Sequence, residues 1–142
     1  MAQLSKPAVQ ALLELDVPLR LGTIDQRGFP RVTPIWFLYD DGVFYMSSVV
    51  GKRHLRDLER DPRASVRIDV EEPIAVGGVR RNQQVGGRGF AELRPDREGE
   101  WTRRITLKYV TGPEGAARAT LRAAQPRVLI VFRPEKLEAI GT

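Results

Sequence analysis

The chain has 142 residues, which is enough for one domain with its own hydrophobic core. It has no cysteine and a single histidine, which excludes disulfides, thiolate zinc sites, iron–sulfur clusters, cysteine nucleophiles and multi-histidine metal sites within one chain. The formal net charge is +5 and the excess is mostly arginine, which suits phosphate or carboxylate partners, although most such side chains are simply solvated. Because no run of about 18 apolar residues occurs, we expect no membrane span. The prediction is a cytoplasmic protein of one domain, residues 1–142.

The first predicted element is a short helix. Ser5 is a suitable N-cap, Pro7 fits the first turn, and the apolar spacing that ends at Leu13 is helical. Pro18 then stops the helix. The stretch lacks a small-residue cleavage signature, so a helix is preferred to a signal peptide.

Three strands with turn chemistry between them follow the helix. The segments Leu19–Ile24, Arg31–Tyr39 and Val43–Ser48 predict an antiparallel meander, with Gly42 supplying the positive φ of a tight hairpin turn. Pro34 cannot donate to a ladder, so it lies on an edge strand or at a bulge, and the two are about equally supported.

The remainder of the chain alternates strands with short helices. The predicted elements are a helix at 51–60, a strand at 63–69, a long strand at 79–93 bent at Gly86-Gly87, a helix presenting Trp101, Ile105 and Tyr109 on one face, a helix at 114–124, and strands at 127–132 and 137–140. Six or so strands predict a mainly β protein, a β-barrel with a few helices. A barrel this small is filled by its own side chains, so a cofactor-sized ligand must lie outside it in a groove, which dimerisation could wall.

One candidate site surrounds the start of the second helix. Two hydroxyls close a strand and cations open the helix: Ser47, Ser48, Lys52, Arg53 and His54. Helix N-termini attract anions, and cations there are unfavourable unless an anion such as phosphate neutralises them. A solvated basic turn is an equally supported interpretation, and a lone histidine on a helix is usually polar surface.

A second candidate site lies on the strand before the hairpin: Arg31, Val32, Thr33, Pro34, Ile35 and Trp36. This strand is predicted to lie antiparallel to Val43–Ser48, so its residues of one parity share a face with the hydroxyl pair, and a flat ring could lie there. Core packing is the simpler interpretation of the apolar members, and for Phe37 it is preferred. No nucleotide, hydrolase or metal motif occurs, the catalytic residues stay unknown, and an enzyme with this inventory needs a cofactor for its chemistry.

Several segments resemble the pyridoxamine 5'-phosphate oxidase-like flavin/deazaflavin split-barrel superfamily. They are LGTIDQRGFPRVTPIWFLYDDGVFYMSS, GKRHLRDLERDPRASVRID, GVRRNQQVGGRGFAEL, LKYVTGPEG and RVLIVFRPEKLEAIG, which together cover nearly the whole chain. The phrase L-x-x-D-P at 58–62 is the most specific of them. The resemblance is strongest to the branch that uses coenzyme F-420, a deazaflavin.

The resemblance implies a six-stranded antiparallel split β-barrel of the FMN-binding type and a homodimer with two cofactor sites at the subunit interface. It also implies an oxidoreductase that uses coenzyme F-420, or FMN as the alternative, to transfer hydride to or from a small organic substrate. By position, Arg31, Thr33, Pro34, Ile35 and Trp36 line the ring and its side chain. Ser47 and Ser48 meet the linker, and Lys52, Arg53 and His54 hold the phosphate.

Two other function classes stay open at this point. The same superfamily contains non-catalytic carriers or sensors of flavins and tetrapyrroles, which would bind a cofactor without turnover. A nucleic-acid binder is suggested by charge alone, and the few aromatic residues and missing binding motifs argue against it.

Overall fold

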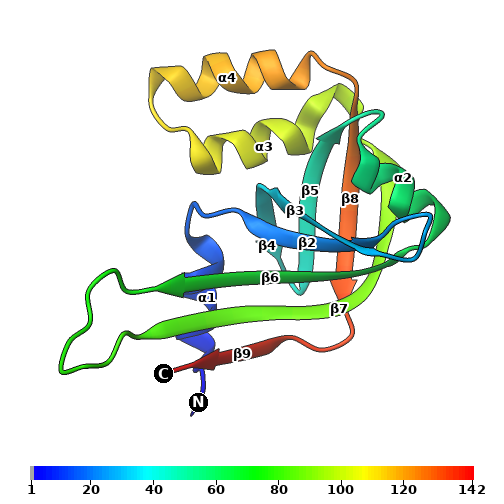
Figure 1. Ribbon diagram of the computed structural model, residues 1–142. Helices are drawn as coiled ribbons and strands as arrows, with labels where there is room; N and C mark the ends of the chain where they lie inside the picture. Colours follow the sequence, from blue (N-terminus) through cyan, green and yellow to red (C-terminus); the bar gives the residue numbers. More distant parts are fainter. Residues whose placement is uncertain (1) are drawn as a thin grey trace.

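Nine strands and four helices make up the computed structural model, which describes residues 2–142 (Figure 1). The strands are β1 (Ala2–Gln3), β2 (Leu19–Ile24), β3 (Pro30–Ile35), β4 (Phe37–Asp40), β5 (Val43–Val49), β6 (Arg63–Glu71), β7 (Asn82–Pro95), β8 (Arg127–Pro134) and β9 (Glu138–Gly141). The helices are α1 (Lys6–Glu14), α2 (Arg53–Arg60), α3 (Glu100–Tyr109) and α4 (Pro113–Ala123), with a 3-10 turn at Arg97–Gly99.

The strands form one antiparallel sheet in the order β3-β2-β6-β7-β8-β5-β4, with β9 added beside the start of β7 and β1 beside β9. The first and last strands of this order, β3 and β4, are consecutive in the chain and are separated by Trp36 alone. The sheet therefore closes on itself through this residue. With β3 and β4 counted as one interrupted strand, the barrel has six strands, as the sequence predicted.

The interruption at Trp36 corrects the predicted strand Arg31–Tyr39. Its first half is β3 and pairs with β2, and only its second half, β4, pairs with β5. The prediction that Arg31 to Trp36 lie antiparallel to Val43–Ser48 was therefore wrong. Pro34 lies on β3, which pairs on one side only, so the edge-strand interpretation of this proline is confirmed.

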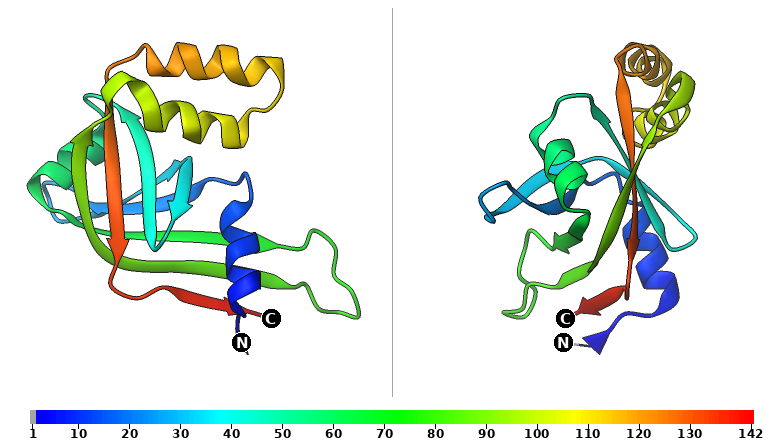
Figure 2. Two further views of the ribbon diagram at one scale, coloured as in Figure 1. Left: turned by 180° about the vertical axis from the view of Figure 1, so that it is seen from behind. Right: turned by 90° about the vertical axis from the view of Figure 1, so that its right-hand side faces the viewer.

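Strand β7 bends sharply, running beside β6 and β9 and then curving upward beside β8 (Figures 1 and 2). Three glycines lie in the bend, and a Cβ added at Gly86, Gly87 or Gly89 would collide with a backbone carbonyl oxygen of a neighbouring segment. Only glycine allows backbones to approach this closely, so this trio explains where the barrel turns from one half to the other.

Large apolar side chains fill the barrel. Phe37, Phe44, Met46, Ile130 and Phe132 are fully buried, and the Phe44 ring centroid lies 5.8 Å from that of Phe37 and 6.1 Å from that of Phe132. The prediction that Phe37 packs in the core is confirmed. Because the interior is occupied by side chains, a ligand must bind on the outside.

The helices cover the ends and flanks of the barrel (Figure 2). Helix α1 starts as predicted, with the Ser5 hydroxyl accepting a hydrogen bond from the backbone N–H of Ala8 at 3.3 Å. Lys108 of α3 donates to the backbone carbonyls of Leu13 and Phe37, both at 3.1 Å, and so joins α1 to β4. Within residues 2–142, no helix has the length and apolar character that a membrane crossing requires.

Candidate functional site

A groove of about 690 Å³ lies on the outside of the barrel, where β3, the end of β5 and the start of α2 meet. It brings together nine of the ten residues predicted to bind a cofactor: Arg31, Thr33, Pro34, Ile35, Ser47, Ser48, Lys52, Arg53 and His54. Trp36 is the exception. The groove's volume lies in the range of small-molecule sites, roughly 300–1,000 Å³.

The two serines are buried and fixed by hydrogen bonds behind the groove. The Ser48 hydroxyl lies 2.7 Å from Nε2 of His54, and the Ser47 hydroxyl lies 2.5 Å from that of Thr102 on α3. Thr102 in turn donates to the Asp96 carboxylate at 2.6 Å. These contacts hold both serine side chains in one orientation, so this part of the groove is rigid before any ligand binds.

Among residues 2–142, four cationic side chains and no carboxylate line the groove: Arg31, Lys52, Arg53 and Arg127. Lys52 is the N-cap of α2 and its side chain makes no capping hydrogen bond, and the first turn of the helix has no acidic residue. The backbone N–H groups of this turn add a partial positive charge to the cations around them. An anion such as phosphate is the natural ligand for such an arrangement.

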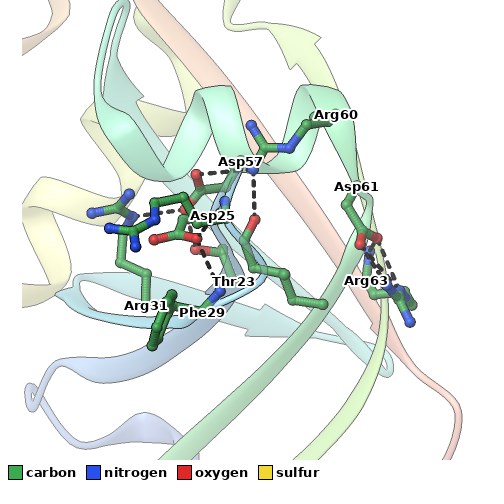
Figure 3. Close-up of polar contacts among 10 residues, drawn as sticks. Thr23, Asp25, Phe29, Arg31, Asp57, Arg60, Asp61 and Arg63 are labelled. Atoms are coloured by element: carbon green, nitrogen blue, oxygen red, sulfur yellow. Dashed lines mark hydrogen bonds and ion pairs between the residues drawn. The ribbon is translucent and has the colours of Figure 1, made fainter.

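Arg31 is held in place by Asp57, a buried carboxylate of α2 (Figure 3). The Arg31 Nε donates to Asp57 at 2.7 Å, and the Thr23 hydroxyl donates to the same oxygen at 2.8 Å. Burial alone would raise the pKa of Asp57, but hydrogen bonds from Arg31 and Thr23 and the charge of Arg31 outweigh it and leave the pKa below its ordinary value. Asp57 therefore stays ionised and locks β3 against α2.

His54 is buried, which corrects the expectation that a lone histidine on this helix is polar surface. Only 7% of its surface is exposed, and it is one of the buried residues of α2 together with Leu55 and Leu58. Burial and the charges of Lys52 and Arg31 lower the pKa of His54, against an opposing effect of Asp57. The ring is therefore neutral near pH 7, and its Nε2 contact orients Ser48.

Trp36 does not line the groove but a neighbouring hollow that it shares with Pro34 and Ile35. Its ring stacks on Tyr109 of α3, with centroids 4.5 Å apart, and the Arg122 guanidinium carbon lies 4.7 Å from the centroid of the Trp36 ring. The ring is thus engaged by the protein itself, at the point where the barrel closes.

Two residues of the site were missed by sequence reasoning. Arg127 enters the groove from the start of β8, which pairs with the end of β5 through the register Val49 to Arg127. Only knowledge of strand order could have placed it there. Asp57 was missed because its partner, Arg31, is 26 positions earlier in the chain. The residue pattern of the helix does not indicate a contact over that distance.

The groove combines an open strand edge, apolar side chains and cations. Strand β3 pairs with β2 alone, so backbone groups along its other edge are open to a ligand. Val32, with 66% of its surface exposed, and Ile35 offer apolar contact, while Lys52 and Arg53 supply positive charge. These features fit a flavin or deazaflavin with a phosphorylated side chain.

The fold and the groove define a split-barrel protein with an external groove lined by cationic side chains. Residues 5–141 match the family model described as pyridoxamine 5'-phosphate oxidase, and the chain belongs to this family. A comparison with curated proteins found no match.

Solved structures with a similar fold are named for F-420, FAD or heme. The chain is similar to an F-420 reductase (25% identity, 90% of this chain and 94% of that one, TM-score 0.64). It is also similar to an FAD-binding protein from Mesorhizobium loti (23% identity, 97% and 93%, TM-score 0.65). A third similar structure is HutZ, the heme storage protein from Vibrio cholerae (19% identity, 93% and 92%, TM-score 0.70). The latter two likenesses concern the fold alone.

Proposed function

We propose that the chain is an oxidoreductase that binds coenzyme F-420 in the groove, with FMN as the alternative cofactor. The proposal rests on one observation: in residues 2–142, a groove with four cations, no carboxylate and an open strand edge lies on a fold of the pyridoxamine 5'-phosphate oxidase family. The likeness to an F-420 reductase at 25% identity supports the deazaflavin over FMN. The substrate is a small organic hydride acceptor or donor.

Each part of the groove has a role in this proposal. Lys52, Arg53 and the N-terminus of α2 bind the phosphate. Ser48, which is oriented by His54, contacts the part of the cofactor that links the ring to the phosphate. The edge of β3, with Ile35, holds the ring. The bound cofactor supplies the hydride chemistry. The protein positions it against the substrate, which is consistent with the lack of an obvious catalytic acid among the residues that line the groove.

The proposed assembly is a homodimer in which the second copy walls the groove. Large apolar side chains lie exposed near it: Phe29 at the turn before β3, Val32 on β3 and Val50 after β5, each with more than half of its surface accessible. Clusters of exposed apolar side chains mark association surfaces. Sedimentation equilibrium tests this part separately, and a strictly monomeric protein contradicts it.

The cofactor part is tested by titrating the purified protein with coenzyme F-420, FMN and riboflavin, followed by fluorescence. In the variant Lys52→Ala/Arg53→Ala, we expect the Kd for FMN and F-420 to rise about 100-fold, because each charged hydrogen bond contributes about 1.5–3 kcal/mol. Riboflavin, which has no phosphate, should bind both proteins alike. The matched control is Arg103→Ala/Arg118→Ala, which removes two exposed cations that do not line the groove. An unchanged affinity for FMN and F-420 in the first variant refutes the phosphate site.

A second candidate function is a non-catalytic carrier of a flavin or tetrapyrrole. The observation in its favour is that no obvious catalytic acid lines the groove, since binding without turnover needs none. Turnover with reduced F-420 or FMN and a panel of enones, quinones and nitro compounds separates the two functions. Tight cofactor binding with no turnover favours the carrier.

A further inference from the structure

A second hollow, of about 290 Å³, adjoins the groove and shares Arg31 and Arg53 with it. It is lined by five arginines, of which one comes from the turn between β2 and β3 and three from α2: Arg27, Arg31, Arg53, Arg56 and Arg60. Two aspartates, Asp25 and Asp57, also line it. The formal charge of the lining is therefore strongly positive, and it continues the positive charge of the groove without a break.

Both aspartates are already used by the protein (Figure 3). The buried Asp57 carboxylate accepts hydrogen bonds from Arg31, Thr23 and, at 3.5 Å, Arg60. One oxygen of Asp25 accepts two backbone N–H groups of its own turn, those of Arg27 and Phe29, each at 2.9 Å. These carboxylates hold the turn and the helix in place, and Asp57 neutralises mainly Arg31.

Three of the five arginines lack such partners. Among residues 2–142, no carboxylate lies within ion-pair distance of Arg27, Arg53 or Arg56. Arg53, Arg56 and Arg60 lie three or four positions apart on α2, so they are neighbours on one face of the helix. Like charges at this spacing destabilise a helix, and an anion in the hollow would relieve the repulsion.

We propose that this second hollow binds an anionic extension of the cofactor that lies beyond the phosphate held in the groove. The inference rests on the proposed function, since the groove must hold the first phosphate. A mononucleotide such as FMN has one phosphate and fills the groove alone. A ligand that fills both sites carries further negative charge. Two known chemistries supply it: the second phosphate of a dinucleotide such as FAD, or the carboxylates of the oligoglutamate tail of coenzyme F-420.

The test compares the variant Arg27→Ala/Arg56→Ala with wild type in titrations against FMN, FAD and coenzyme F-420. Both side chains line the second hollow and neither lines the groove. We expect the Kd for at least one of the longer ligands to rise about tenfold or more, and the Kd for FMN to change less than about twofold. For the longer ligand, the salt dependence of the Kd should also become shallower, because two charge contacts are lost. Arg103→Ala/Arg118→Ala is the control for net charge.

The pattern of losses identifies the occupant. Weakening of FAD alone assigns the hollow to a phosphate, weakening of F-420 alone assigns it to carboxylates, and weakening of both supports a general anion site. The proposal is overturned if FMN weakens as much as the longer ligands, if none of the three changes, or if wild type binds FMN more tightly than both longer ligands. Wild-type protein that binds none of them refutes the proposed function, and the second subsite with it.

Discussion

Inside the barrel, Phe44 and Met46 of β5 are fully buried among other apolar side chains. The next two residues of the same strand, Ser47 and Ser48, instead line a groove that also contains arginine and lysine. Packing of apolar side chains in the interior stabilises the fold, and this needs no ligand. The groove holds charges that the protein only partly neutralises. Stability and binding are therefore carried by different side chains, and substitutions should separate them.

The largest expected effect is that of removing an interior ring. Phe132→Ala should lower the free energy of unfolding by about 3–5 kcal/mol, because it removes buried apolar surface and leaves a cavity among Phe44 and its neighbours. Urea unfolding measures the loss. The matched control is Phe90→Ala, since 55% of the surface of Phe90 is exposed and its loss should matter little.

Because Phe132 lies in the interior and not in the groove, the folded Phe132→Ala protein should still bind cofactor with nearly unchanged affinity. A loss of affinity in fully folded protein, at low temperature and without denaturant, would show that the interior and the groove are coupled. Equal destabilisation by Phe132→Ala and Phe90→Ala would instead contradict the burial that places Phe132 in the interior.

Asp57 belongs to both regions, since it is buried like an interior residue and fixes Arg31 of the groove. Asp57→Asn should cost about 2–3 kcal/mol at pH 7, because the partners of a buried carboxylate lose a charge-assisted hydrogen bond. It should also weaken cofactor binding, as Arg31 is no longer held. The control is Asp61→Asn, at the end of the same helix, whose exposed pair with Arg63 should contribute less to stability.

The pH dependence distinguishes these effects from a general loss of packing. The pKa of Asp57 in the folded protein is below its ordinary value, so its contribution is fully present above about pH 4 and is lost as the pH falls through the folded value. The stability difference between wild type and Asp57→Asn should therefore shrink below about pH 4. A constant difference down to pH 2 contradicts the ion pair.

The strands and the barrel were predictable because their signals are local. Apolar alternation, Gly42 in its turn with a φ of 82°, and the glycines of β7 each act within a few residues. The break at Trp36 was not predictable, since Ile35 and Phe37 on either side continue an apolar strand. The break arises because β3 and β4 must lie at the two edges that close the barrel, which is a property of the whole sheet.

In the candidate site, too, local features were predictable from the sequence and features that depend on packing were not. Lys52 and Arg53 were identified from their place at the start of a helix, a local feature. The burial of His54 depends on how α2 packs against the barrel, and its contact with Ser48 depends on the loop that joins β5 to the helix. Sequence spacing alone does not fix the direction of the His54 side chain. The sequence therefore predicted its place in the groove but not its burial.

The smallest expected effect concerns the proton on His54. Charge from Lys52 contributes to lowering the pKa of this ring, after burial, so a phosphate bound at Lys52 should raise it. The folded protein should then take up a fraction of one proton when FMN binds near pH 6.5. Calorimetric titration in two buffers with different ionisation enthalpies gives the number of protons exchanged, for wild type and for His54→Asn.

The difference between the two proteins isolates the histidine, because the phosphate itself also titrates near pH 6 and changes the total in both. Arg31 and Asp57, the other charged groups that act on His54, are paired with each other and change little on binding. Riboflavin lacks the phosphate and should give no difference between the proteins. If FMN also gives no difference in proton uptake between the two proteins, the phosphate does not bind beside Lys52. The cations of the groove would then have to be explained without a bound phosphate.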